Sequence, residues 1–264
     1  MASTNKNPIG IFDSGVGGTS IWKEIHQLLP YESTIYLADS KHAPYGQKSK
    51  DEIISLSIKN TEYLLNKNCK LIVVACNTAT TNAITYLREK YSVPFIGIEP
   101  AIKPASLQTT TNNIGILATK GTLNSQLFAT TSNKLNNEIN IIEQIGEGLV
   151  ELIENNQLES LKMTNLLEKH LSGFLKLNID YLVLGCTHYP YLIPQIQKII
   201  GHKIKIIDSG QAVAKQTKRI LESNGLINFD SENSANQFYS NTYKEVLENL
   251  LSDYNKVSID YLDF

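Results

Sequence analysis

Short apolar runs alternate along the chain with longer stretches of helical periodicity. The run Leu71–Ala75 contains no polar residue, which is typical of a parallel strand covered on both faces. Such runs predict strands at Pro8–Phe12, Thr34–Ala38, Leu71–Ala75, Pro94–Ile98, Asn113–Leu117, Ile139–Glu143, Tyr181–Leu184 and Lys203–Ile207. Between them, helical patterns include Ser20–Leu29, Lys50–Asn66, Thr80–Tyr91 and Tyr191–Ile200. This alternation predicts an α/β fold in which crossover helices connect parallel strands.

The sequence also repeats itself over a long distance. IGIFDSGVGG from Ile9 resembles IGILATKGT from Ile114, and PFIGIEP before Ala101 resembles IKIIDSG before Gln211. A third pair consists of KLIVVACNTAT and DYLVLGCTHYP. The three pairs keep their order at offsets of roughly 105 to 110 residues, which indicates an internal duplication. We therefore predict two pseudo-symmetric open parallel-sheet domains with the active site in the cleft between them.

The second copy is predicted to be an insertion, because the chain continues well beyond its last strand. We assign residues 1–98 plus 209–264 to the first domain and residues 99–208 to the second. The tail is predicted to contain a helix at Gln211–Asn224, a strand at Gln237–Tyr239 and a helix at Tyr243–Leu251. The polar stretch Ser231–Asn236 is predicted to be a surface loop.

Composition excludes several classes of protein. With 24 basic and 26 acidic residues, the chain lacks the positive charge of a nucleic-acid binder. It has no apolar run of about 20 residues and no signal-peptide pattern at its start, so we expect a cytoplasmic protein that does not engage a membrane. The three cysteines contain no CxxC pair and no zinc-like cluster, so neither a disulfide framework nor a metal is expected.

Two of the cysteines occupy equivalent positions in the two repeats. Cys76 and Cys186 each follow a predicted strand and precede a helix, where ligands of open α/β sheets bind. The amino-terminal end of a helix also favours a thiolate. Pseudo-symmetry would bring both thiols to one cleft, and inversion of a carbon centre needs a base on one face and an acid on the other. A single cysteine after a strand, such as Cys69, is more typically a small buried apolar residue.

Polar loops at the same strand ends offer binding groups. Gly15, Gly17 and Gly18 in FDSGVGGTS let backbone amides approach a carboxylate or phosphate, although a tight strand-to-helix turn explains them equally well. Asp13 and Ser14 would bind a substrate ammonium or handle protons, or would cap the helix.

Other side chains near the two cysteines have similar alternatives. His188 would assist proton transfer at Cys186, bind a carboxylate, or merely form a hydrogen bond in a turn. In HAPYGQKS, Tyr45 and Gly46 would cover a small ligand or form an ordinary turn. Helix caps or anion ligands are predicted at Asn77, Thr78 and Thr187.

The strings FDSGVGG, PYG, ACNTA and GCTHYP, in this order and spacing, resemble the motifs of glutamate racemases over nearly the whole chain. The resemblance implies two α/β domains, a homodimer, glutamate as substrate, and no cofactor or metal. It implies that Cys186 takes the proton from L-glutamate and Cys76 takes it from D-glutamate. D-Glutamate would then serve peptidoglycan synthesis in a bacterium. The motif positions implied to bind substrate or assist the thiols are Asp13, Ser14, Tyr45, Gly46, Asn77, Thr78, Thr187 and His188.

One segment departs from the family pattern. Many members carry Leu-Phe-Val-Pro-Leu-Val-Glu before the second cysteine, where this chain has IGEGLVELIE. Aligning the common LVE makes Glu151 the carboxylate that assists Cys186, and Glu147 replaces it if the register slips by one turn. Without the resemblance, the acidic positions Glu147, Glu151 and Glu154 are typical of a solvated helix face.

Three other functions remain compatible with these residues. An aspartate racemase would use the same chemistry with a different side-chain pocket. A redox protein would join Cys76 and Cys186 in a reversible disulfide. A non-catalytic module would bind a dicarboxylate on FDSGVGG without exchanging its α-proton.

Overall fold

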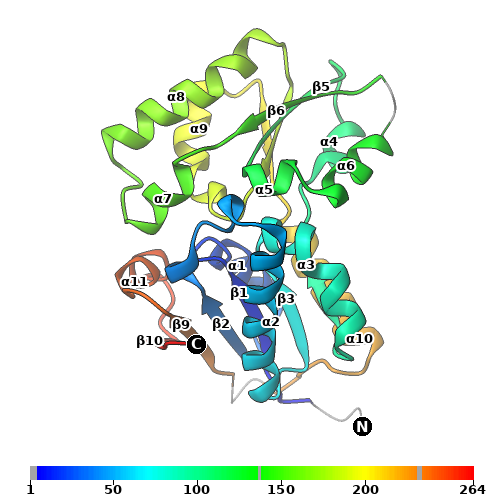
Figure 1. The fold of residues 1–264 in the computed structure, drawn as a ribbon, viewed down its shortest axis with the longest axis vertical. Helices are drawn as coiled ribbons and strands as arrows, with labels where there is room; N and C mark the ends of the chain where they lie inside the picture. The colour runs from blue at the N-terminus through cyan, green and yellow to red at the C-terminus, as the bar shows by residue number, and fades with distance from the viewer. Residues whose placement is uncertain (1–4, 136–137, 231–233) are drawn as a thin grey trace.

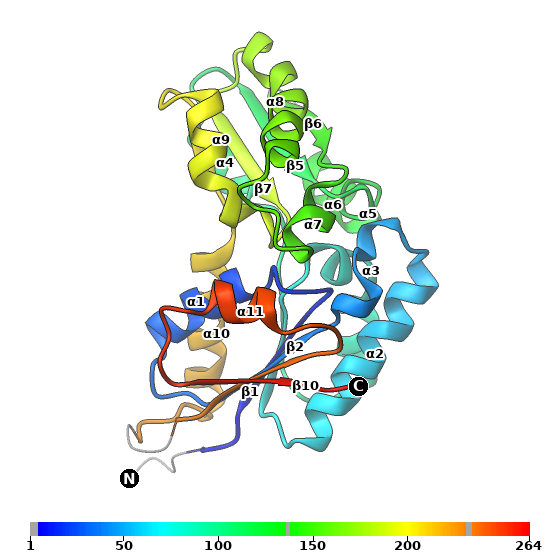
Figure 2. The same ribbon diagram turned by 90° about the vertical axis from the view of Figure 1, so that its left-hand side faces the viewer.

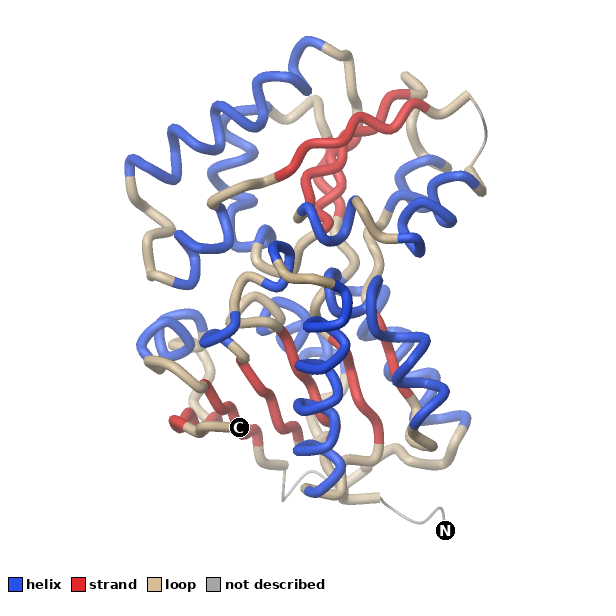
Figure 3. The backbone as a smooth tube through the Cα atoms, in the orientation of Figure 1, coloured by secondary structure: helices blue, strands red, loops and turns tan. Residues whose placement is uncertain are grey.

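The computed structural model describes residues 5–135, 138–230 and 234–264 and contains two parallel sheets stacked end to end (Figure 1, Figure 3). The first sheet has the order β10-β9-β2-β1-β3-β4 and the second has the order β6-β5-β7-β8. The strands of the first sheet are β1 (Ile9–Asp13), β2 (Thr34–Ala38), β3 (Leu71–Val74), β4 (Phe95–Gly97), β9 (Asn236–Ser240) and β10 (Val257–Tyr261). Those of the second are β5 (Asn113–Ala118), β6 (Asn140–Ile145), β7 (Tyr181–Gly185) and β8 (Lys205–Ile207). The predicted α/β class is confirmed.

The two sheets share a topology. In the first, β1 lies between β2 and β3 and β4 follows β3, while in the second β5 lies between β6 and β7 and β8 follows β7. This common order is what an internal duplication predicts. Strands from residues 1–98 and 209–264 form one sheet and strands from residues 99–208 form the other, while the independence of the two domains stays a prediction.

Helices cover both faces of the first sheet. Its inner strands are wholly buried, as their unbroken apolar runs predict. On one face, α1 (Thr19–Leu28) packs against α10 (Gly210–Ser223), and on the other α2 (Lys50–Asn66) packs against α3 (Asn77–Lys90). The short α11 (Glu245–Leu250) follows β9 and lies beside α1 (Figure 2).

The second sheet is covered in the same way. One face packs against α4 (Ile102–Ser106), α5 (Lys120–Leu123) and α6 (Gln126–Asn133). The other packs against α7 (Leu149–Glu154), α8 (Leu161–Lys176) and α9 (Ile193–Ile200), with the 3₁₀ turn η3 (Tyr189–Leu192) leading into α9. Two further 3₁₀ turns, η1 (Ser40–His42) and η2 (Tyr45–Gln47), follow β2 in the first half of the chain.

The structure also contains elements that the apolar pattern does not single out. Strand β10 is half exposed at the edge of its sheet, so its sequence VSIDY gives only a weak signal. Within the predicted loop 231–236, residues 231–233 lie outside the described residues, and Asn236 already belongs to β9.

Among the described residues, no helix is both long and apolar enough for a membrane crossing. The same residues contain no group of three or more His, Cys, Asp or Glu side chains suited to a metal ion.

A buried ion pair lies at the end of the first sheet that is remote from the second sheet. Lys70, just before β3, places its Nζ 2.6 Å from Oε2 of Glu32, and both side chains are almost fully buried. The backbone N–H of Asn228 donates to Oε1 of Glu32 at 2.7 Å, and Lys70 Nζ donates to the carbonyl of Asn5 at 2.7 Å. The pair thus ties together four segments that are distant in sequence.

Glu32→Ala should destabilise the fold by about 3 to 5 kcal/mol, because it leaves the Lys70 ammonium buried without its counter-charge. Urea unfolding followed by circular dichroism measures the loss. Glu222→Ala is the matched control, since it breaks the exposed Lys218–Glu222 pair and should cost at most about 1 kcal/mol. Equal losses in the two variants would contradict the role assigned to burial.

Candidate active site

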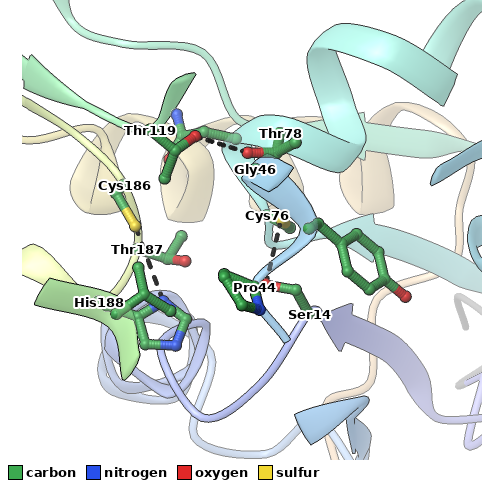
Figure 4. Close-up of a pocket in the computed structure, with 12 residues that line it drawn as sticks. Ser14, Pro44, Gly46, Cys76, Thr78, Thr119, Cys186, Thr187 and His188 are labelled. Atoms are coloured by element: carbon green, nitrogen blue, oxygen red, sulfur yellow. Dashed lines mark hydrogen bonds between the residues drawn. The ribbon is translucent and has the colours of Figure 1, made fainter. Parts of the chain in front are cut away.

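A small cavity of about 10 Å³ lies where the carboxyl ends of the two sheets meet (Figure 4). The loops after β1, β2 and β3 line it from one side, and those after β5 and β7 line it from the other. This volume is about the space that one water molecule needs, so the walls of the cavity lie close together. The residues around it are Ser14, Pro44, Tyr45, Gly46, Cys76, Asn77, Thr78, Thr119, Val150, Cys186, Thr187 and His188.

Cys76 is held at the amino-terminal end of α3. Its Sγ accepts a hydrogen bond from the backbone N–H of Ala79 at 3.4 Å and lies 3.6 Å from the Ser14 hydroxyl. Burial, reinforced by the negative charge of Asp13, raises the pKa of this thiol well above its usual value. The helix end alone therefore does not make Cys76 a thiolate.

Cys186 lies across the cavity from Cys76 and has different partners (Figure 4). Its Sγ is 3.7 Å from Nδ1 of His188, whose Nε2 is 2.5 Å from Oε1 of Glu154. Burial alone would lower the pKa of His188, but its hydrogen bonds to Cys186 and Glu154 raise it well above the usual value. A cationic imidazole therefore lies beside the sulfur of Cys186.

Asp13 is a buried carboxylate at the end of β1. Burial raises its pKa to about 6, while the charge of His188 and a hydrogen bond from the Gly18 N–H at 2.7 Å oppose this rise. The Thr187 hydroxyl lies 3.4 Å from its Oδ2. Asp13 thus contacts the loops that carry both thiols, as its position in the sequence predicts.

The polar residues predicted to bind substrate converge on the cavity. Ser14, Gly46, Thr78 and Thr187 all line it. Neither side-chain atom of Asn77 has a hydrogen-bond partner within the described part of the chain, although both are buried. A buried amide without a partner is costly, so Asn77 is the side chain most available to a ligand.

Tyr45 lines the cavity but its hydroxyl is used elsewhere. It donates to Oδ2 of Asp39 at 2.5 Å and accepts from Nδ2 of Asn60 at 3.2 Å. These two contacts hold the loop to the first half of the chain. The neighbouring Gly46 lies against Thr119 of the second half, where an added Cβ would press on the Thr119 side chain. Tyr45 therefore shapes the wall of the site, and its hydroxyl is already occupied by protein groups.

The acidic residues of α7 are arranged differently from the expected register. Glu151 accepts a hydrogen bond from Nε2 of Gln47 at 2.7 Å on the exposed side, and Glu147, which precedes α7, contacts His170 through its backbone carbonyl. Glu154, one turn beyond Glu151, is the carboxylate that contacts His188. Its side chain is only 10% exposed, which corrects the expectation of a solvated face at this position.

Sequence reasoning did not identify four residues at the site. The sequence pattern predicts a solvated helix face at Glu154, and it does not single out Thr119, Pro44 or Val150. Thr119 is the counterpart of Ser14 in the duplication, because it follows β5 as Ser14 follows the end of β1. That correspondence was the signal that would have found it.

The glycines of FDSGVGG serve close packing between the two halves of the chain. A Cβ at Gly15 would overlap the carboxylate of Glu154, and one at Gly17 would overlap the ring of His188. The Val16 N–H donates to Oε1 of Glu154 at 2.7 Å, and the Gly17 N–H lies 3.2 Å from Nε2 of His188. The Val16 amide binds a protein carboxylate here, and the glycines are explained by this close packing without an anionic ligand.

Comparisons with known proteins define the class to which this fold and site belong. The sequence model of the Asp/Glu/hydantoin racemase family matches residues 9–217, and the chain belongs to this family of isomerases. Glutamate racemase from Herpetosiphon aurantiacus is 44% identical over 221 residues, which cover 84% of this chain and 87% of the relative. Within the family, the chain is a member of the glutamate racemases.

Solved structures agree with this assignment. A glutamate racemase isoform from Bacillus anthracis superposes with a TM-score of 0.87 at 32% identity and covers 98% of both chains. Escherichia coli glutamate racemase, in complex with L-glutamate and the activator UDP-MurNAc-Ala, superposes with a TM-score of 0.86 at 32% identity. That match covers 97% of this chain and 98% of the other.

The pKa of Asp13 makes stability depend on pH. The native carboxyl keeps its proton up to about pH 6, whereas the usual value is 3.8, so the unfolded state binds fewer protons between these values. The free energy of unfolding therefore falls as pH rises through this window. Asp13→Asn removes the titration, so its stability relative to the native chain should increase by about 1 kcal/mol between about pH 5 and about pH 7.5. Urea unfolding at both pH values measures this.

Asp180→Asn provides a control of opposite sign. Burial opposes the shift, but hydrogen bonds from Thr109 and Thr110 lower the pKa of Asp180. The relative stability of this variant should fall as pH rises from the acid range. The assignment of Asp13 fails if its variant shows no rise or follows Asp180→Asn.

Proposed function

We propose that the chain interconverts L- and D-glutamate without a cofactor, using Cys76 and Cys186 as acid and base, and supplies D-glutamate for peptidoglycan synthesis. The observation that carries this proposal is the convergence of the two cysteines, from equivalent positions in two sheets, on opposite sides of one small cavity. Proton transfer to either face of a carbon centre requires that arrangement.

The proposed reaction moves one proton at each face of Cα. With L-glutamate, the Cys186 thiolate takes the α-proton and becomes a thiol, while the Cys76 thiol gives its proton to the opposite face and becomes a thiolate. The reverse direction starts from D-glutamate and exchanges the two roles. The developing negative charge spreads onto the α-carboxylate, where hydrogen-bond donors stabilise it most. Asn77, Thr78 and Thr187 are the side chains placed to provide them.

In this proposal a different ionisable side chain assists each of the two thiols. His188, held by Glu154, supports the thiolate of Cys186. Asp13 faces Cys76 and, with a pKa near neutrality, can exchange a proton with it. In this proposal Glu154 is the carboxylate that assists Cys186, while Glu151 joins the two halves at the mouth through Gln47.

Glutamate is the proposed substrate because the relative from Herpetosiphon aurantiacus is named a glutamate racemase and the Escherichia coli structure contains L-glutamate. Ser14, Tyr45 and Gly46 would complete the binding wall on the side of the first sheet. A homodimer, implied by the family resemblance, and a cytoplasmic location, expected from the sequence pattern, stay predictions, and light scattering of the purified protein tests the first.

Incubation of the protein in deuterated buffer with L- or D-glutamate, without cofactor, tests the function directly. Circular dichroism should show loss of optical activity while NMR shows replacement of the α-proton. Cys76→Ser and Cys186→Ser should each lower racemisation by about 10² to 10⁴ fold, because each removes one proton carrier. Cys76→Ser should still exchange the α-proton of L-glutamate without inverting it, and Cys186→Ser should do so only with D-glutamate.

Three results would contradict this scheme in whole or in part. Near-normal racemisation by either serine variant would exclude the two-thiol mechanism. Binding of glutamate without α-proton exchange by the unmodified chain would favour the non-catalytic module, and activity only with aspartate would change the substrate.

Substitution of the two α7 glutamates decides which one assists Cys186. Glu154→Gln should lower kcat about ten-fold, because a neutral amide supports cationic His188 less than a carboxylate does. Glu151→Gln, which alters an exposed hydrogen bond to Gln47, should change kcat by less than about three-fold. Steady-state kinetics in both directions measures this, and the reverse order would restore Glu151 as the assisting residue.

A further inference from the structure

We propose that Ser40 is a positioning residue for the second thiol, acting across the boundary between the two sheets. Its hydroxyl holds Glu154, which in turn holds His188 beside Cys186. This inference rests on the proposed racemase function, because it assigns a further residue to the proton relay of that reaction.

A continuous chain of contacts supports the proposal. The Ser40 hydroxyl donates to Oε2 of Glu154 at 2.6 Å, and the Val16 N–H donates to Oε1 at 2.7 Å. The same Oε1 lies 2.5 Å from Nε2 of His188, and Nδ1 of that ring lies 3.7 Å from Sγ of Cys186. Both donors come from loops of the first sheet, although the thiol belongs to the second. The relay of Cys186 is therefore completed only when the two halves meet.

Ser40 is needed because Glu154 is the last residue of α7 and has open space beside it. A pocket outside the cavity is lined by Ser40, Glu154 and Asn155, together with residues of the tail such as Glu245. A carboxylate at this border can turn outward into water or inward toward His188. With Oε2 held by Ser40, the inward orientation that brings Oε1 to His188 is retained.

The position of Ser40 is itself fixed by a buried carboxylate. Asp39 is 2% exposed and accepts hydrogen bonds from Nδ1 of His42 and Nδ2 of Asn241, each at 2.6 Å. Oδ1 of Asn241 accepts from the Lys41 N–H at 2.9 Å. The Ser40 hydroxyl therefore stands on a rigid turn, which a positioning role requires.

The test compares Ser40→Ala with Ser40→Thr, which keeps the hydroxyl, and with Ser49→Ala as matched control. Ser49 lies in the same loop but caps α2 through Glu52, and within the described residues it makes no hydrogen bond to Glu154. Because the two enantiomers have equal free energy, any variant must change kcat/KM equally in both directions. We expect Ser40→Ala to lower it about ten-fold, the value of one hydrogen bond to a charged group.

The primary isotope effect separates positioning from a general structural effect. Ser40→Ala should raise the barrier at Cys186, so proton abstraction from α-deuterated L-glutamate becomes more rate-limiting and its isotope effect on kcat/KM rises. With α-deuterated D-glutamate, abstraction by Cys76 becomes less rate-limiting and the isotope effect falls. Ser40→Thr should restore the unmodified pattern, and Ser49→Ala should not alter it.

Isotope effects that stay unchanged, or that shift equally in both directions, would overturn the role of Ser40 while leaving the racemase proposal intact. Absence of α-proton exchange in the unmodified chain would overturn both. If thermal melting shows that Ser40→Ala does not fold, Ser40→Cys replaces the hydroxyl with a weaker donor of similar size. The same opposite shifts, or their absence, then decide the question.

Discussion

The rest of the site depends on one contact, the packing of the His188–Glu154 pair onto the glycine loop that follows β1. The imidazole and the carboxylate belong to the half of the chain that forms the second sheet. The backbone N–H groups of Val16 and Gly17, which they contact, belong to the loop after β1. This packing requires Gly15 and Gly17, because a side chain at either position would occupy the same space. The cleft between the sheets is thereby closed by the same two side chains that are proposed to assist Cys186.

The two thiols have equivalent positions in the fold but unequal surroundings. Cys76 faces a buried acid, and desolvation keeps its proton in place. Cys186 faces an imidazole whose charge is stabilised by Glu154. The two sheets thus provide similar scaffolds, and the side chains beside the two cysteines differ. In the proposed reaction one proton is shared between the two thiols, so this asymmetry would determine the resting state without favouring either product.

Much of this arrangement could be predicted from sequence, for identifiable reasons. Uniformly apolar strands such as β3 gave clear signals, and the repeat placed Cys76 and Cys186 at matching strand ends. The register of α7 was harder, because Glu151 and Glu154 lie one turn apart and only tertiary packing selects between them. The edge strand β10 and the wall residue Pro44 carry no pattern of their own, and their roles come from neighbours distant in sequence.

The return of the chain to its first sheet has a consequence for biosynthesis. Strand β9 pairs with β2, and Asn241, just after β9, braces the turn that begins at Asp39. A nascent chain that has already emerged through both cysteines still lacks these contacts. Translation must pass residue 241 before the turn beside Glu154 acquires its support, so the site is completed only after the segments that carry both cysteines have been synthesised.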